Sequence, residues 1–313
     1  VFAGIPCTFL YNILAGIIRS LGDSKTPVLF LAIASAINIG LDLIFVLLFG
    51  MGVEGPAIAT VLAQGISGII CLFYMYRKFP VLHVSRDEWK PELHYMGKLC
   101  FIGIPMGLQY SITAIGSLVL QTAVNGLGAM VVAGVTAAQK INMFISCPIE
   151  SLGQTMAPYA GQNMGAGNVK RVKQGFFSGT IISTVFALAV LPIFWGFAPQ
   201  IISIFGKSPD VIAIGTVGLR IDSCFLVFLG LIYTTRNVLN GAGDAMFSLM
   251  TGIVEMCGRI FLARPLTMVP MFGRYGVFFA TGLTWFLNGT ISLVRYKRGK
   301  WKKLNVISKI SEN

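Results

Sequence analysis

Long apolar runs separated by short polar segments form the dominant pattern of the chain. A helix needs about 20 apolar residues to cross about 30 Å of hydrocarbon, and eight stretches of the sequence reach that length. A further, partial stretch opens the chain at 1–18. The predicted spanning helices cover residues 28–49, 55–76, 99–124, 129–157, 176–198, 211–239, 245–269 and 276–296. The pattern predicts an all-α polytopic membrane protein.

Composition agrees with this class and excludes most soluble enzymes. Of the 313 residues, 55% are hydrophobic and 12% are charged, whereas about a quarter of a soluble domain is charged. The sequence has two histidines and neither a metalloprotease nor a nucleotide-loop motif. Each of the six cysteines lies in an apolar stretch without a paired spacing. We therefore expect a protein that is not an enzyme and that holds no cofactor and no metal framework.

The basic residues predict how the chain is oriented. Alternate connections carry eighteen Lys and Arg residues in one set and three in the other, and cytoplasmic loops collect positive charge. The net charge of +12 therefore has a topological reading, and we expect no nucleic-acid partner. The sequence predicts a multi-pass plasma-membrane protein with a cytoplasmic C-terminus and a basic tail at 298–313.

The sequence also repeats itself at an offset of 221 residues. The repeat pairs Gly22-Asp23 with Gly243-Asp244, Gly55 with Gly276, and Ala59-Thr60 with Ala280-Thr281. Both copies keep their charged loops in register, which predicts two halves of the same orientation, as in transporters built from parallel repeats. If each copy spans the full offset, the first begins more than a hundred residues before Val1. We therefore expect the sequence to be an N-terminally truncated fragment.

Three polar residues in the first half are candidates for binding a cation. Asn38 and Asp42 stand four residues apart, so they share one helix face. Thr60 lies on the next apolar segment. Ionisable groups inside spanning helices are costly and mark candidate sites. A carboxylate with amide and hydroxyl oxygens coordinates Na⁺, and a desolvated carboxyl can also carry a proton.

The second half carries a different polar set. Glu255 and Arg259 have the spacing of an internal ion pair. In the repeat register Arg259 takes the place of Asn38, and Ala263 that of Asp42. A series of polar positions on two consecutive helices can line an aqueous cavity. The predicted substrate-cavity residues are Gln109, Thr113, Gln139, Asn142, Glu255 and Arg259.

Several motifs resemble those of one transporter family. They are Arg19-Ser-Leu-Gly-Asp-Ser-Lys-Thr-Pro27, the loop Gln162-Asn-Met-Gly-Ala-Gly-Asn168, Asn240-Gly-Ala-Gly-Asp244 and the tail Arg298-Gly-Lys-Trp301. Together they resemble the multidrug and toxic compound extrusion (MATE) transporters, and most closely the DinF-like branch. The resemblance implies a two-lobe bundle of twelve helices, of which this chain keeps about eight and part of a ninth, starting in the fourth.

The resemblance also implies a division of the chain and a function. Residues 1–80 would close the N-terminal lobe, 81–98 would link the lobes in the cytoplasm, 99–297 would form the C-terminal lobe, and 298–313 would be the basic tail. The implied activity is antiport of organic, often cationic, drugs against Na⁺ or H⁺ by a monomer in the lipid bilayer.

The same resemblance assigns site residues. It places the coupling cation at Asn38, Asp42 and Thr60, the residues reached above from cost and spacing. In the NorM-like branch the cation site uses acidic residues at positions that read Thr113 and Leu229 here, so such a site is not expected.

Two alternatives remain open at this point. Related two-lobe transporters flip lipid-linked oligosaccharides, and they need a more basic cavity than Lys140, Arg236 and Arg259 provide. A non-transporting receptor is the other alternative, and it would show no cation-dependent flux.

Overall fold

The computed structural model describes residues 2–83 and 92–303, and confirms the predicted all-α class. Eight helices in this part of the chain are long and apolar enough to cross a membrane. The chain divides into two compact units, Val1–Glu92 and Leu93–Asn313, called unit 1 and unit 2 below. Residues 84–91 of the predicted linker and 304–313 of the predicted tail lie outside the described residues. The finer division into lobes, linker and tail stays a prediction.

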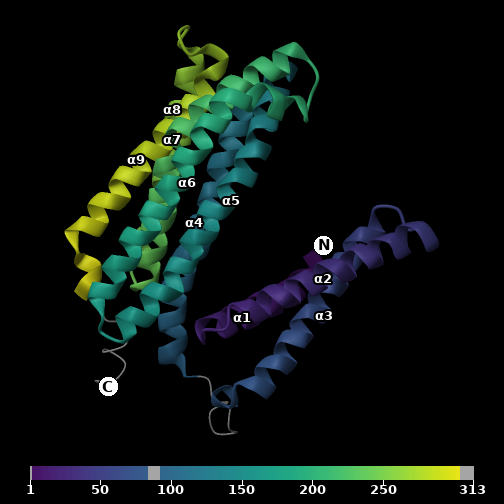
Figure 1. Cartoon of the computed structure of the whole chain (residues 1–313), viewed down its shortest axis with the longest axis vertical. Helices are drawn as coiled ribbons and strands as arrows, with labels where there is room; N and C mark the ends of the chain where they lie inside the picture. The colour runs from purple at the N-terminus through teal and green to yellow at the C-terminus, as the bar shows by residue number, and fades with distance from the viewer. Residues whose placement is uncertain (1, 84–91, 304–313) are drawn as a thin grey trace. The chain divides into compact units, whose positions relative to one another are not determined.

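Unit 1 is a small group of helices in which α3 packs against both α1 and α2 (Figure 1). The apolar side chains Tyr11, Leu14, Ala15, Ile18 and Cys71 are buried together between α1 and α3. The elements are η1 Phe2–Gly4, α1 Ile5–Ser20, α2 Lys25–Leu43, η2 Ile44–Leu48, α3 Glu54–Lys78 and η3 Pro80–Leu82.

Unit 2 is a bundle of six long helices arranged around α7, which packs against α5, α6 and α9 (Figure 1). The other extensive contacts join α4 to α8 and α8 to α9. Its elements are α4 Leu93–Asn125, α5 Ala129–Gly165, α6 Val169–Ser203, α7 Pro209–Gly241, α8 Ala245–Met268, η5 Gly273–Tyr275, α9 Gly276–Arg298 and η6 Lys300–Lys303.

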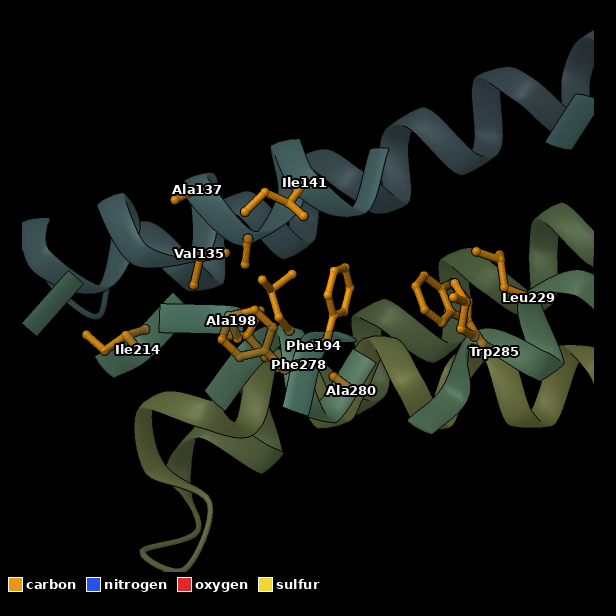
Figure 2. Packing of buried hydrophobic residues seen from close by; sticks show 14 of the residues in the cluster. Val135, Ala137, Ile141, Phe194, Ala198, Ile214, Leu229, Phe278, Ala280 and Trp285 are labelled. Carbon is orange, nitrogen blue, oxygen red and sulfur yellow. The ribbon is translucent and has the colours of Figure 1, made fainter. Parts of the chain in front are cut away.

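The central place of α7 follows from small residues on several of its faces. A Cβ atom at Gly218 would lie 2.2 Å from the Phe278 ring of α9, and one at Gly215 would lie 2.7 Å from Ile202 of α6. In lipid the hydrophobic effect does not drive helices together, and small residues let their backbones approach closely enough for van der Waals packing. Figure 2 shows apolar side chains of the resulting core, among them Phe194, Phe278 and Trp285.

Several helices extend beyond the predicted spans, and α5 and α6 do so furthest. α5 continues to Gly165 and α6 begins at Val169, whereas the apolar runs predicted ends at 157 and a start at 176. Hydropathy identifies only the apolar part of a helix, and the polar turns that continue it carry no such signal. The new start of α6 is capped, because the Asn168 side-chain oxygen accepts a hydrogen bond from the Arg171 N–H at 3.2 Å.

The repeat found in the sequence is visible in the backbone of two turns. Gly22 and Gly243 both adopt a left-handed conformation, with φ of 95° and 90°. After each glycine the next amide donates back into the preceding helix, from Asp23 to the Ile18 carbonyl at 3.3 Å and from Asp244 to the Leu239 carbonyl at 2.8 Å. This pattern closes helix ends whose last carbonyls would otherwise lack donors.

Each turn is then fastened by its aspartate, with a different partner in each copy. Asp23 accepts hydrogen bonds from the Tyr74 hydroxyl at 2.7 Å and from the Thr26 amide at 3.1 Å. These bonds hold the pKa of Asp23 well below its usual range. Asp244 instead pairs with Arg295 at 2.8 Å. Position 295 is the repeat equivalent of Tyr74.

The described start of the predicted basic tail folds back onto unit 2. Trp301 in η6 is fully buried, and its indole N–H donates to the Tyr296 carbonyl at 3.0 Å. The ring of Tyr296 in turn stacks on Phe176 of α6, with centroids 3.8 Å apart. This part of the tail therefore packs on the helix bundle.

Candidate functional site

The structure brings two of the three predicted cation ligands into contact within unit 1. Asn38 lies near the end of α2 and Thr60 in the second turn of α3. The Asn38 amide donates to the Thr60 hydroxyl at 3.5 Å, and this hydroxyl donates to the Pro56 carbonyl at 2.8 Å. Both side-chain oxygens therefore lie where α2 and α3 meet.

Asp42, the third member, stands one helical turn after Asn38 and has no side-chain partner within the described part of the chain. Its Oδ1 atom is buried and has no hydrogen-bond partner among the described residues, and none of the ion pairs found there includes Asp42. Directly after it, Ile44–Leu48 winds as a π-helix, a rare form that is frequent at functional sites. An unpaired carboxylate beside amide and hydroxyl oxygens suits a proton or a hard cation such as Na⁺.

Unit 2 contains a cavity of about 450 Å³ that is lined by residues of α4, α5, α7, α8 and α9. Four of the predicted substrate-cavity residues line it, namely Gln139, Asn142, Glu255 and Arg259. The charged lining residues are Glu150, Asp222, Glu255 and Arg259, and the aromatic ones are Tyr233, Phe278 and Trp285. Carboxylates and aromatic faces together provide the chemistry that attracts organic cations.

The predicted internal ion pair is confirmed. Arg259 donates to the Glu255 carboxylate at 2.6 Å, and both side chains are mostly buried. A second guanidinium nitrogen donates to the Ser117 hydroxyl at 2.5 Å and to the Thr113 carbonyl at 3.2 Å. The pair is thus fastened to α4, and its two charges compensate each other inside the cavity wall.

The other two predicted substrate-cavity residues lie beside the cavity and are not among the residues that line it. Gln109 is 3% exposed and packs on α8, where a Cβ at Gly252 would meet its side chain at 3.0 Å. Its amide donates to the Thr113 hydroxyl at 3.3 Å. These two residues therefore join α4 to α8.

A bond between Asn142 and Asp222 joins α5 to α7 and was not predicted from the sequence. The Asn142 amide donates to Asp222 Oδ2 across 80 residues of sequence, from α5 to α7. Asp222 is 4% exposed and lines the cavity, and its Oδ1 atom has no hydrogen-bond partner among the described residues. An acidic residue inside an apolar run was the only signal available, because no spacing rule links two helices this far apart.

Comparison with known proteins gives one family. The MatE family model matches residues 105–263. The chain is 30% identical over 310 residues to the probable multidrug resistance protein YpnP of Bacillus subtilis, covering 98% of the chain and 68% of that protein. It is 22% identical to the probable multidrug resistance protein NorM of Thermotoga maritima, covering 95% of the chain and 65% of that protein. The chain thus spans about two thirds of the length of these relatives.

Solved structures show the same fold. A crystal structure of MATE in the bent conformation superposes with a TM-score of 0.89 at 23% identity, covering 97% of this chain and 68% of the other. At this identity the likeness supports the architecture of the helices alone.

Proposed function

This chain belongs to the MatE family of transporters, which are not enzymes, and from that premise we propose that it takes part in exporting organic, often cationic, drugs in exchange for Na⁺ or H⁺. The observation that carries the proposal is the unpartnered Asp42 carboxylate beside Asn38 and Thr60. The names of the relatives, which are probable multidrug resistance proteins, support export of small molecules.

The coupling site is assigned to Asn38, Asp42 and Thr60. A bound Na⁺ would take oxygens from all three side chains, whereas a proton would sit on Asp42 alone. Binding of either ion drives transport only if it favours one access state over the other, because a ligand with equal affinity for both states shifts nothing.

The cavity of unit 2 is the proposed contact surface for the drug in this part of the protein. Its ion pair Glu255–Arg259 is internally neutral, so Glu150 and Asp222 are the acidic groups available to balance a bound cation there. This balance favours an organic cation and offers little to a pyrophosphate-linked lipid. Among the described residues Arg259 is the one basic residue that lines the cavity, and it is already paired.

The setting of this activity is also part of the proposal. The eight candidate spans of the described chain support a multi-pass membrane transporter. We assign it to the plasma membrane as a monomer. The basic residues in alternate connections support a cytoplasmic C-terminus.

Gradient-driven efflux tests the proposal directly. Proteoliposomes that contain the full-length protein are loaded with a fluorescent organic cation, and Na⁺ and proton gradients are applied separately. We expect one gradient to drive efflux and Asp42→Asn to reduce that efflux at least tenfold. The amide has no negative charge to balance Na⁺, and it cannot take up and release a proton.

The matched control is Glu54→Gln, which removes an exposed carboxylate at the start of α3 in the same unit. This variant should transport like the unmodified protein. Efflux that Asp42→Asn leaves intact would refute the coupling site, and absence of efflux under both gradients would refute the antiport function.

A further inference from the structure

Asp222 is a buried acidic group of the unit 2 cavity that the proposed coupling site does not use. It lies near the middle of α7, is 4% exposed and contributes to the cavity wall. Asn142 of α5 donates to one carboxylate oxygen, and the other oxygen has no partner among the described residues. One carboxylate oxygen of Asp222 therefore accepts a hydrogen bond, and within the described residues the other accepts none.

An ionised carboxylate in this position is costly. Burying a charge without a compensating partner costs several kcal/mol or changes the protonation state. A divalent ion such as Ca²⁺ would need six or more oxygen ligands, and within the described residues no group of three or more acidic, His or Cys side chains could hold a metal ion. The one side chain bonded to Asp222 in the described chain, Asn142, turns an N–H donor toward it instead of an oxygen. A proton on Oδ1 removes the charge and needs only one acceptor, which water in the cavity can provide. The local chemistry thus favours a proton over a metal ion.

Other charged groups on α5, α7 and α8 have contacts of their own. On α8, Arg259 is paired with Glu255. On α7 itself, Arg220 donates to the Trp195 carbonyl of α6 at 2.9 Å. Lys140 of α5 lies 5.9 Å from the Phe205 ring, and Arg236 lies over the Tyr233 ring at 5.0 Å.

The remaining ionisable groups of the packed helices are accounted for as follows. Glu150 and Tyr233 line the same cavity, while the basic residues of α6 and α9 in the described chain lie in the first turns of α6 and the last turns of α9. Arg274 of η5 lies over the Tyr275 ring at 5.3 Å. Among the described residues, then, no basic side chain is in ion-pair contact with Asp222.

We propose that Asp222, held by Asn142, is a second proton-binding site inside the cavity, and that binding of a monovalent organic cation displaces its proton. The inference rests on the proposed function and adds to it an exchange within unit 2. In the exchange the O–H bond of the neutral carboxylic acid breaks, its proton leaves to solvent, and the carboxylate becomes the counter-ion of the bound cation. One positive charge enters as one leaves, so the net charge of the cavity does not change.

Binding of tetraphenylphosphonium to the purified full-length protein in nanodiscs tests this exchange without transport. Calorimetry in buffers of different ionisation enthalpy counts the protons released per cation bound. We expect release approaching one proton at the acidic end of the working range. The affinity should rise by up to about tenfold per pH unit there, because proton and cation compete for one group.

Three variants separate this site from the coupling site. Asp222→Asn should abolish the proton release and flatten the pH dependence, whereas Asp42→Asn should leave both in place. Asp210→Asn, an exposed carboxylate at the start of α7, is the matched control and should behave like the unmodified protein. Unchanged proton release from Asp222→Asn, or its loss from Asp42→Asn alone, would overturn the inference. Failure of gradient-driven efflux would bear on the proposed function and leave this binding result standing.

A measurement on the unmodified protein covers the case in which Asp222→Asn does not fold. Infrared difference spectra recorded on addition of tetraphenylphosphonium should show loss of a protonated carboxyl band and gain of a carboxylate band. Spectra with no change in carboxyl bands would refute the displacement of a proton.

Discussion

The two copies of the repeat, α1–α3 in unit 1 and α7–α9 in unit 2, share a backbone plan but not their charges. Both close a helix with a left-handed glycine, Gly22 and Gly243. Both also carry a threonine that bonds back to its own helix, Thr60 to Pro56 at 2.8 Å and Thr281 to Val277 at 3.1 Å. Backbone geometry has therefore been kept where the polar side chains of the copies have diverged.

The difference lies on the helix that follows the glycine turn. In unit 1 it carries Asn38 and the unpartnered Asp42, whereas the equivalent positions in unit 2 hold Arg259 and Ala263. Arg259 is neutralised by Glu255 of the same helix. In unit 1, Asp42 thus has no basic partner among the described residues. In unit 2, the carboxylate of Glu255 is neutralised by Arg259 of the same helix.

Removing the guanidinium group of Arg259 should have the largest effect on stability. Arg259→Ala leaves Glu255 buried without a partner, and we expect a loss of about 3 kcal/mol in the free energy of unfolding. Denaturant titration in detergent micelles measures it. The double variant Arg259→Leu with Glu255→Leu should recover most of the loss, since no charge is then stranded. If the double variant is as unstable as the single one, the two side chains stabilise the protein through packing and not through their charges.

The equivalent change in unit 1 sharpens the contrast. Asn38→Ala removes a single long hydrogen bond of 3.5 Å and should cost about 0.5 kcal/mol.

Breaking the side-chain contacts of Asp23 and Asp244 should also destabilise unit 2 more than unit 1, but by a smaller margin. Arg295→Ala strands Asp244, which is 5% exposed, and should cost about 2 kcal/mol. Tyr74→Phe should cost about 1 kcal/mol, because Asp23 keeps its bonds to Thr26 and Lys78. Hydrogen exchange at the amides of the two turns compares the effects in one experiment. Equal protection losses would contradict the distinction between the copies.

The smallest effect concerns acid sensitivity of the turn in unit 1. Because hydrogen bonds from Tyr74 and Thr26 lower the pKa of Asp23 in the folded protein, its contribution to stability is present above the unfolded pKa of about 3.9. That contribution is lost as the pH falls through the lower, folded pKa. Melting temperatures of the unmodified protein and Asp23→Asn should therefore converge below about pH 4 and show a constant difference from pH 5 to 8. A difference that changes across the neutral range would contradict this assignment.

Much of the architecture could be predicted from the sequence because spanning helices are long apolar runs. The repeat could also be read directly, since its glycines and aspartates keep one register. The pair Glu255–Arg259 followed from helical spacing alone, because both residues lie on one helix.

Contacts between helices could not be derived in the same way. The polar series in the sequence included Gln109 and Thr113 but did not reveal that Gln109 packs on Gly252 of α8 instead of lining the cavity. The bond from Asn142 to Asp222 depends on how α5 packs on α7. The ends of α5 and α6 were missed because their polar extensions carry no hydropathy signal.

Trp285 gives the cavity an optical property of its own. Trp285 is 8% exposed and lines the same cavity as Asp222, whereas Trp195 is 52% exposed on α6 and Trp301 is buried against Tyr296. Indole emission responds to the polarity and charge of its immediate surroundings, so the fluorescence of this residue serves as an intrinsic gauge of cavity occupancy. Subtracting the spectrum of Trp285→Phe isolates that signal and allows ligands to be ranked without attaching a label.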